Sequence, residues 1–252
     1  KMDIIKLYKV INDDLEEEAI KKFDSREQYI KWSQNFYEKY GYKSYGLRVP
    51  EIENIVKKYV NQFIGLSLQE RFDLSRRFYK SEYIAQTHFG LKLLEISIPE
   101  LKPQNFEFLD ELLNYITNWG PTDSFSLYIM QSLLRKYPNE TKQLIKKWNI
   151  SDHIWKKRAS VVTFTRKIGL EGEYVIFLLE LCDNLIWDKE DLVRKAVGWA
   201  LKDNMFGKNK EKVLNYVKKL RKMGVSSTIT LYAIRKLKGK ERDIILNIRP
   251  PK

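Results

Sequence analysis

The sequence has very little of the chemistry that disulfides and metal sites require. It contains one cysteine, Cys182, and two histidines, His88 and His153, in 252 residues. A single cysteine excludes an internal disulfide framework and is typical of proteins from a reducing, intracellular compartment. No His-Glu-x-x-His, Cys-x-x-Cys or calcium-loop spacing occurs in the sequence, so we expect no protein-bound metal ion.

The sequence also lacks long apolar runs and the glycine-rich loops that bind nucleotides. No apolar run reaches the roughly 18 residues that a membrane span needs, and the first residues, Lys1-Met2-Asp3-Ile4, contain no signal-peptide core. Neither a phosphate-binding glycine loop nor Gly-x-Ser-x-Gly is present. We therefore expect a cytoplasmic, intracellular protein that has no membrane contact and no cofactor.

Positive charge is abundant, and it lies in the second half of the sequence. Residues 1–126 contain 18 Lys/Arg and 20 Asp/Glu, a net charge of −2, whereas residues 127–252 contain 28 Lys/Arg and 13 Asp/Glu, a net charge of +15. This asymmetry predicts a surface for a polyanion, built mainly from the second half. A generally lysine-rich proteome would raise the charge everywhere, and the near-neutral first half argues against that explanation.

Apolar residues recur at helical spacing along the chain, as Trp32, Phe36 and Tyr40 do after the capping-box pair Ser25 and Gln28. No segment alternates apolar and polar residues as a strand does, and no Asn-Gly hairpin turn joins apolar runs. The sequence thus predicts an all-α chain of about a dozen or more helices with short connections.

The rhythm of these helices predicts a helical-repeat array. The period of the helix pairs is roughly 35–45 residues, in the range of HEAT-type repeats. We expect residues 1–252 to form a single domain and a monomer, an α-solenoid of antiparallel helix pairs with a concave basic groove. One helix is expected to begin at Pro121, and another to run unbroken from Ser151 to Gly169.

The break at Asn118-Trp119-Gly120-Pro121-Thr122-Asp123-Ser124 is the first candidate for a functional site. Pro121 suits the first position of a helix, where its missing N–H is no loss. A helix that starts there places Asp123 in its first turn, close to the positive end of the macrodipole, with Trp119 four residues earlier on the same side. An ordinary helix start, in which the acid stabilises the terminus and the tryptophan packs between helices, explains the same stretch.

Two later segments are rich in basic and aromatic residues. Arg158 and Arg166 are eight residues apart, about two helical turns along a similar face. Arg158 could equally lie on a solvated basic face. Trp199 follows Gly198, which would let another backbone or a ligand come close, although Trp199 could also be a plain core residue.

Together these segments resemble the DNA alkylation repair family, the AlkC/AlkD-like HEAT-repeat DNA glycosylases. Trp119 and Asp123 stand where that family has a tryptophan and its catalytic aspartate. Arg158 and Trp199 stand where it has a lesion-side arginine and a second tryptophan. The segment Lys195-Ala196-Val197-Gly198-Trp199 is the most specific part of a resemblance that covers most of residues 25–237.

An early segment carries the same resemblance, and two positions depart from it. Tyr45-Gly46-Leu47-Arg48-Val49-Pro50-Glu51 resembles a turn of the family and places Tyr37 near a tyrosine on a family helix. Gly120-Pro121 replaces the family's more usual acidic-polar pair, which could shift the carboxylate of Asp123. Asp191 stands where relatives can have an aromatic residue.

The resemblance implies a DNA repair glycosylase, an enzyme that hydrolyses the N-glycosidic bond of cationic alkylated purines in duplex DNA. The substrates it implies are 3-methyladenine and 7-methylguanine, removed without a base-flipping pocket. The residues that it implies are Asp123, Trp119, Trp199 and Arg158 as catalytic, and Tyr37, Arg48, Arg166, Lys195 and Lys202 as DNA-binding.

Two other interpretations remain open. A non-catalytic helical-repeat module that binds nucleic acid or protein explains the charge and the helices equally well, but it does not explain why Trp119, Asp123, Arg158 and Trp199 stand at the family positions. A catalytically silent relative is also possible: Asp123 argues against it, whereas Gly120-Pro121 leaves it open. Release of a base from methylated duplex DNA would distinguish these interpretations.

Overall fold

The structure is a computed structural model that describes residues 3–250, and its regular elements are helices. No β-strand forms within this range, where a single isolated bridge joins Lys43 to Tyr83. The predicted all-α class is confirmed. No helix in the described part of the chain combines the length and the apolar character that crossing a bilayer requires.

Contacts divide the described residues into two units, with the boundary between Ser124 and Phe125. The single-domain organisation, the monomeric state and the concave basic groove stay predictions. The first unit contains α1 (Ile4–Ile20), α2 (Arg26–Tyr40), α3 (Val49–Ile64), α4 (Leu68–Lys80), α5 (Ile84–Ser97), the 3₁₀ turn η1 (Pro103–Asn105), α6 (Phe106–Leu113) and α7 (Trp119–Ser124).

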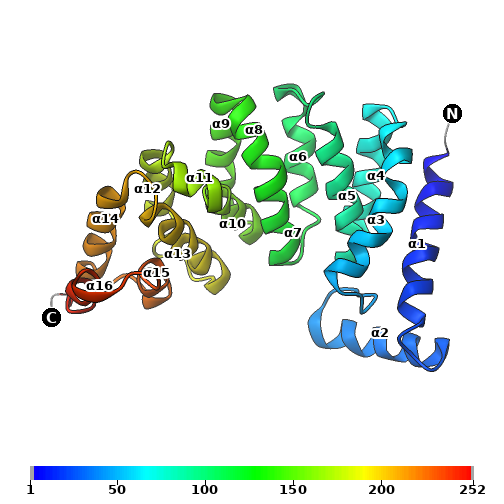
Figure 1. Cartoon of the computed structure of the whole chain (residues 1–252), viewed down its shortest axis with the longest axis horizontal. Helices are drawn as coiled ribbons and strands as arrows, with labels where there is room; N and C mark the ends of the chain where they lie inside the picture. Colours follow the sequence, from blue (N-terminus) through cyan, green and yellow to red (C-terminus); the bar gives the residue numbers. More distant parts are fainter. Residues whose placement is uncertain (1–2, 251–252) are drawn as a thin grey trace. The chain divides into compact units, whose positions relative to one another are not determined.

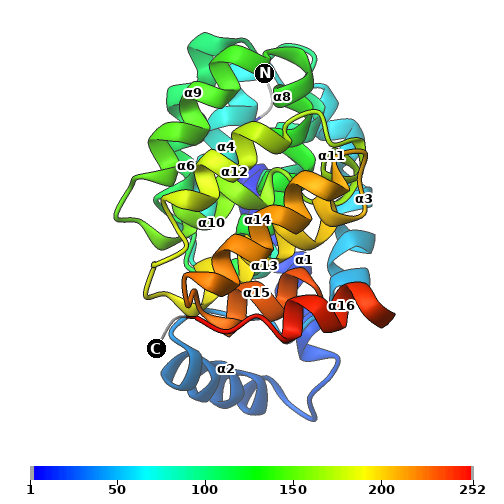
Figure 2. The same cartoon turned by 90° about the vertical axis from the view of Figure 1, so that its left-hand side faces the viewer.

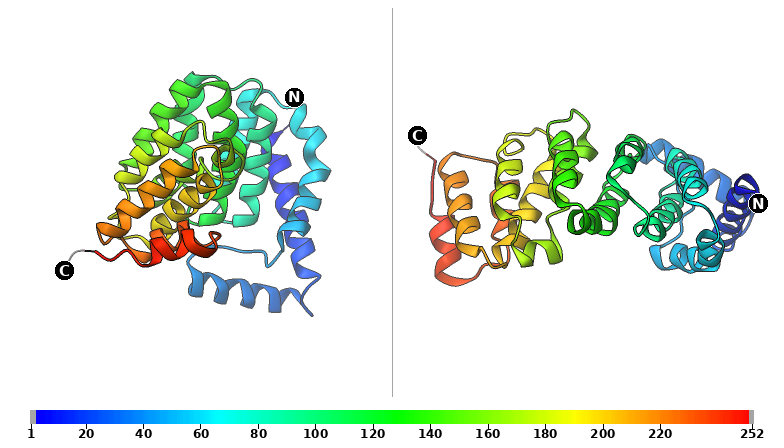
Figure 3. Two further views of the ribbon diagram at one scale, coloured as in Figure 1. Left: turned by 60° about the vertical axis from the view of Figure 1, so that its left-hand side comes forward. Right: turned by 90° about the horizontal axis from the view of Figure 1, so that it is seen from above.

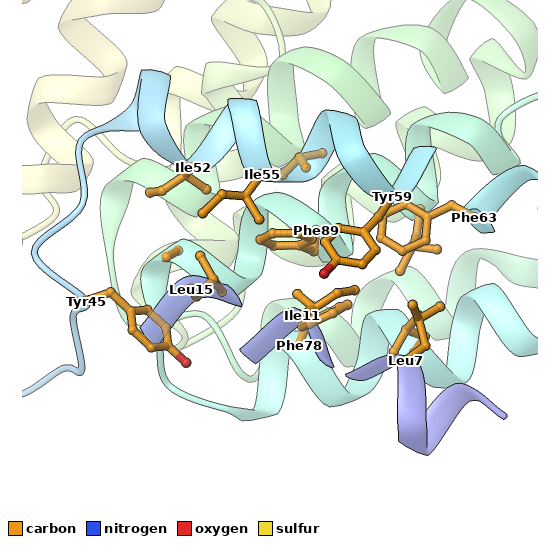
Figure 4. Packing of buried hydrophobic residues seen from close by; sticks show 14 of the residues in the cluster. Leu7, Ile11, Leu15, Tyr45, Ile52, Ile55, Tyr59, Phe63, Phe78 and Phe89 are labelled. Carbon is orange, nitrogen blue, oxygen red and sulfur yellow. The ribbon is translucent and has the colours of Figure 1, made fainter. Parts of the chain in front are cut away.

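The core of the first unit follows directly from the apolar spacing of its helices. Leu7, Ile11 and Leu15 recur every four residues and line one side of α1. They pack with apolar residues of α3, such as Ile55 and Phe63, and with residues of α4 and α5 (Figure 4). Helix α5 packs against both α3 and α4, whereas α2 lies crosswise at the end of α1 (Figures 1 and 2).

The second unit consists of the π-helix η2 (Phe125–Met130), α8 (Gln131–Lys136), α9 (Pro138–Asn149), α10 (Ile154–Val162), α11 (Arg166–Glu171), α12 (Val175–Asp183), α13 (Asp191–Met205), α14 (Lys210–Lys222), α15 (Ser227–Ala233) and α16 (Gly239–Leu246). Within it the helices follow one another in space in the order of the sequence, from green to red (Figure 3). Successive packing of this kind is what a helical-repeat array requires.

Helix α13 is the central element of the second unit, because it packs against α10, α11, α14 and α15. Its closest approach is to α15, and Gly198 makes that approach possible. A Cβ atom on Gly198 would lie 2.7 Å from Cβ of Tyr232 and 3.1 Å from the carbonyl oxygen of Ile229. The close neighbour that the sequence predicts at Gly198 is therefore the backbone of α15.

The prediction of one helix from Ser151 to Gly169 is wrong, because the chain leaves the helix after Val162 and starts α11 at Arg166. The amide of Gln131 donates to the carbonyl oxygens of Thr163 and Thr165, at 3.0 Å each. These bonds give the backbone partners outside a helix, as buried peptide groups require. Arg158 and Arg166 consequently do not share one helical face.

We expect Gly198→Ala to lower the free energy of unfolding by about 1–2 kcal/mol. Overpacking costs roughly 1–3 kcal/mol, which outweighs the gain of up to about 1 kcal/mol from replacing glycine in a helix. Urea unfolding measures the change. Gly65→Ala is the matched control, since its Cβ would come no nearer than 3.5 Å to the Gln62 carbonyl oxygen. A Gly198→Ala protein as stable as the Gly65→Ala protein would contradict the close packing of α13 on α15.

Candidate functional site

Trp119 and Asp123 lie on α7, which begins two residues earlier than the sequence suggests. Asn118 caps this helix, since its side-chain oxygen accepts the N–H of Gly120 at 2.9 Å and its carbonyl accepts the Thr122 hydroxyl at 2.9 Å. Pro121 is thus the third helical residue, and the expectation that Asp123 lies in the first turn is wrong. Pro121 remains harmless there, because N–H groups of the first turn have no partner within the helix.

The two side chains of this pair differ sharply in their exposure. The Trp119 side chain is 53% exposed, whereas Asp123 is only 8% exposed. A tryptophan so exposed is not a buried residue that packs between helices, as the ordinary interpretation supposed. An accessible ring and a largely desolvated carboxylate therefore lie one helical turn apart. The π-helix η2 follows directly after α7, and such segments are frequent at functional sites. No pattern in the sequence predicted this π-helix.

Arg158 is buried in α10, with 6% exposure, so its interpretation as a residue on a solvated face is wrong. Its Nη1 donates to the carbonyl oxygen of Leu192, in the first turn of α13, at 2.6 Å. An arginine held in this way joins α10 to α13 and keeps its charge below the surface. Its proposed lesion-side role stays a prediction.

Arg166, Trp199 and Lys202 meet around a residue that the sequence analysis missed, Asp203. One carboxylate oxygen, Oδ2, accepts the indole N–H of Trp199 at 2.8 Å and the backbone N–H of Arg166 at 2.6 Å. The other oxygen, Oδ1, lies 2.8 Å from Nζ of Lys202. The guanidinium of Arg166 lies 5.9 Å from the ring centroid of Trp199, within the range of a cation–π contact. The four-residue spacing of Trp199 and Asp203 on one helix could have revealed this carboxylate.

The same group of cations and rings extends to α15. Nζ of Lys202 lies 5.9 Å from the ring centroid of Tyr232, and the guanidinium of Arg235 lies 4.0 Å from it. Lys202 itself is only 5% exposed. Trp199 is half-buried, so it is not a plain core residue. Tyr232 and Arg235 were missed because their nearness to α13 is a tertiary feature that the sequence does not display.

The remaining predicted residues, Lys195, Tyr37 and Arg48, are all exposed. Lys195 is exposed on α13 and pairs at 2.7 Å with Asp191. The hydrogen bond from Lys195 holds the pKa of Asp191 below its usual value. In the first unit Tyr37 is exposed on α2, and Arg48, also exposed, lies 3.3 Å from Glu51. Hydrogen bonds from Lys22 and from the Arg48 backbone lower the pKa of Glu51 to about 2.

The structure therefore forms two local arrangements, each within its own unit. Trp119 and Asp123 share α7 in the first unit, and Arg166, Trp199 and Lys202 converge on Asp203 in the second. Within residues 3–250 no group of three or more His, Cys, Asp or Glu side chains is placed to hold a metal ion. The first arrangement offers a carboxylate near an aromatic ring, and the second combines a carboxylate and a ring with cations. Aromatic rings attract positively charged groups, and cations attract phosphates.

Comparison with known proteins gives a family match over most of the chain. Residues 15–237 match the model of a family described as DNA alkylation repair enzyme. Among solved structures, the chain is similar to a predicted DNA alkylation repair enzyme from Enterococcus faecalis, with a TM-score of 0.72 and 15% sequence identity over 84% of this chain and 95% of that one. At this identity the likeness shows the fold alone. No curated protein matches the sequence.

We expect Arg158→Ala to lower the free energy of unfolding by about 1–3 kcal/mol, because it removes a buried hydrogen bond of a charged group together with its packing. Lys195→Ala is the control: it removes a cation from an exposed ion pair, which changes stability by about 0.5 kcal/mol or less. Thermal and urea unfolding measure both changes. Equal stability of the two variants would contradict a structural role for Arg158.

Proposed function

Because the chain belongs to the DNA alkylation repair enzyme family, we propose that it is a DNA glycosylase that removes cationic alkylated purines from duplex DNA. The substrates are N3- or N7-alkylated bases such as 3-methyladenine and 7-methylguanine, and the reaction hydrolyses the bond between the base and deoxyribose. The observation that carries the proposal is the pair on α7, the exposed Trp119 one turn before the largely buried Asp123.

The chemistry of these lesions matches the few catalytic groups that the chain possesses. Alkylation at N3 or N7 gives the base a positive charge, so its bond to the sugar is already weak and the base leaves without being protonated. The transition state carries positive charge on the deoxyribose. A carboxylate next to that charge stabilises it, and this is the role that we assign to Asp123. Its burial strengthens the effect, since charges interact more strongly where water is excluded.

Aromatic rings supply the second component of the proposed site. The face of a tryptophan attracts a cation by roughly 0.5–2 kcal/mol, and we assign this interaction to Trp119 and Trp199. Both rings are accessible enough for such contact, since Trp119 is exposed and Trp199 half-buried. Rings that act from the surface of a helical-repeat array suit a mechanism without the enclosed pocket of base-flipping enzymes.

DNA is the partner that the family implies, and the second unit carries most of the charge to meet it. We propose that exposed residues contact phosphates directly: Arg166 and Lys195 in the second unit, with Arg48 and Tyr37 in the first. Arg158 and Lys202, which are buried, are proposed to act through the positions that they fix. The HEAT-like repeat, with the phosphates in a concave groove, is part of the same proposal.

The alternative function, a non-catalytic module that binds nucleic acid or protein, needs the charge but no carboxylate. It assigns no role to a buried acid next to an exposed tryptophan. Base release by an Asp123→Asn protein separates the two functions.

Asp123→Asn should reduce the single-turnover release of 7-methylguanine from methylated duplex DNA by about 10²-fold or more, because one electrostatic stabiliser of the transition state is lost. Affinity for DNA should stay level or rise, since a negative charge is removed. Glu107→Gln, an exposed acid of α6, is the control with the same charge change. Release at the wild-type rate by a folded Asp123→Asn protein would end the catalytic interpretation.

Trp119→Ala should weaken both binding of the methylated duplex and the rate of release, because stacking acts before and during bond breaking. The matched control is Trp187→Ala, which removes a tryptophan of similar exposure, 61% against 53%, outside the proposed site. Fluorescence anisotropy and base-release assays measure the two effects. If the two variants behave alike, Trp119 has no special part in the site.

Binding to duplex DNA should depend strongly on salt and little on sequence, because phosphates carry the contact. Arg166→Ala and Lys195→Ala should each reduce the slope of log K against log salt by about one unit. Lys6→Ala, an exposed lysine of α1, is the control and should leave the slope unchanged. Identical slopes for all three variants would contradict direct phosphate contacts by Arg166 and Lys195.

A further inference from the structure

The carboxylate of Asp203 is the most heavily used polar group near the tryptophan of α13. It receives the indole N–H of Trp199 at 2.8 Å, the backbone N–H of Arg166 at 2.6 Å and the ammonium of Lys202 at 2.8 Å. Its side chain is only 13% exposed, so these donors replace most of the water that a carboxylate would otherwise hold. Charge-assisted hydrogen bonds are also stronger and more directional than neutral ones.

The backbone around Arg166 depends on this carboxylate. Arg166 has a φ of +51°, in the left-handed region that residues other than glycine rarely adopt. Such a conformation persists only where its surroundings hold it in place. The N–H that Asp203 binds is that of Arg166 itself, and Gly169, in the next turn of α11, allows the close approach: a Cβ there would lie 3.1 Å from Cβ of Asp203.

The hydrogen bond from the indole N–H to Asp203 also holds the Trp199 ring. Trp199 and Asp203 are one turn apart on α13, so a bond between their side chains selects one orientation of the ring. The guanidinium of Arg166 then lies 5.9 Å from the centre of that ring. One carboxylate thus sets both the ring and the arginine that lies over it, and Lys202 balances its negative charge.

We propose that Asp203 is a positioning residue, which holds Trp199 and Arg166 in the mutual arrangement that the DNA site needs. The inference rests on the proposed function for the role of those two residues. Asp203 touches neither the lesion nor the sugar. Its effect is to present an oriented ring beside an exposed cation and to keep its own charge, paired with Lys202, from repelling phosphates.

The carboxylate accepts all three donors at once, with Oδ2 toward Trp199 and Arg166 and Oδ1 toward Lys202. Asparagine has a single acceptor oxygen, so in either orientation its NH₂ group faces Lys202 or the N–H groups of Trp199 and Arg166. Trp199→Phe is the complementary change, since it keeps a smaller aromatic face and removes the indole N–H donor.

The experiment compares wild type with Asp203→Asn, Trp199→Phe and a control, Asp183→Asn. Asp183 is an exposed carboxylate of α12 that accepts the Tyr216 hydroxyl, a bond that asparagine can keep. Three quantities are measured: the Trp199 indole N–H resonance, identified by its loss in Trp199→Phe, the affinity for undamaged duplex DNA, and single-turnover release of 7-methylguanine below the melting temperature of each variant.

In Asp203→Asn we expect the Trp199 indole resonance to move and its proton to exchange faster with water. The release rate should fall by about 10²-fold, the effect of a misplaced site group, while DNA affinity holds or rises. Trp199→Phe should lose release activity in the same direction, and Asp183→Asn should match wild type in all three measurements. If Asp203→Asn does not fold, a Trp199→Phe protein that releases the base at the wild-type rate overturns the proposal.

The two hypotheses fail in different ways. An unchanged indole resonance in folded Asp203→Asn overturns the positioning role whether or not the protein excises bases. So does a lower melting temperature combined with a wild-type release rate, since that pattern is purely structural. A wild-type protein that releases no base overturns the proposed function instead, and the indole resonance then still decides whether Asp203 orients Trp199.

Discussion

The break between α10 and α11 is the constraint on which the arrangement around α13 depends. Where the chain leaves the helix, its backbone groups need partners, and the second unit supplies them from side chains far away in the sequence. The Gln131 amide binds two of the carbonyl oxygens, and the Asn204 amide binds that of Phe164 at 2.8 Å. Asp203 takes the N–H of Arg166 at 2.6 Å. Because buried peptide groups are costly to leave unpaired, these bonds fix where α11 starts and where Arg166 lies.

This constraint explains which parts of the molecule could be predicted from the sequence. The helices follow from local spacing: Leu7, Ile11 and Leu15 mark the buried side of α1 without reference to any other segment. The break after Val162 depends on Gln131, more than thirty residues earlier, and no local pattern announces it. A run of residues that reads as one helix was therefore divided by tertiary hydrogen bonds, and the supposed common face of Arg158 and Arg166 was lost with it.

The candidate site could be predicted where it depends on which residues the chain contains. It could not be predicted where it depends on which of those residues the fold buries. Trp119 and Asp123 lie one turn apart, as their spacing suggests, although α7 starts at Trp119 and not at the predicted Pro121. Net charge directs attention to the second half, but it cannot distinguish an exposed cation such as Lys195 from Arg158 and Lys202, which the fold encloses. Enclosure depends on partners from other helices, Leu192 for Arg158 and Tyr232 for Lys202. A polyanion can contact exposed cations such as Lys195 directly, whereas buried cations such as Arg158 and Lys202 fix the positions of the residues around them.

Gly120-Pro121 was expected to affect the carboxylate of Asp123, because the family resemblance implies a different pair of residues there. If this pair distorted the start of α7, the proposed pairing of Trp119 with Asp123 would fail. The start is instead set by Asn118, whose side chain accepts the Gly120 N–H, and Pro121 removes only an N–H that the first turn leaves unpaired anyway. A Cβ on residue 120 would meet nothing closer than the Asn118 side-chain oxygen at 3.4 Å, so glycine is not needed there for space. The departure therefore leaves intact the helical register that puts the ring one turn before the carboxylate.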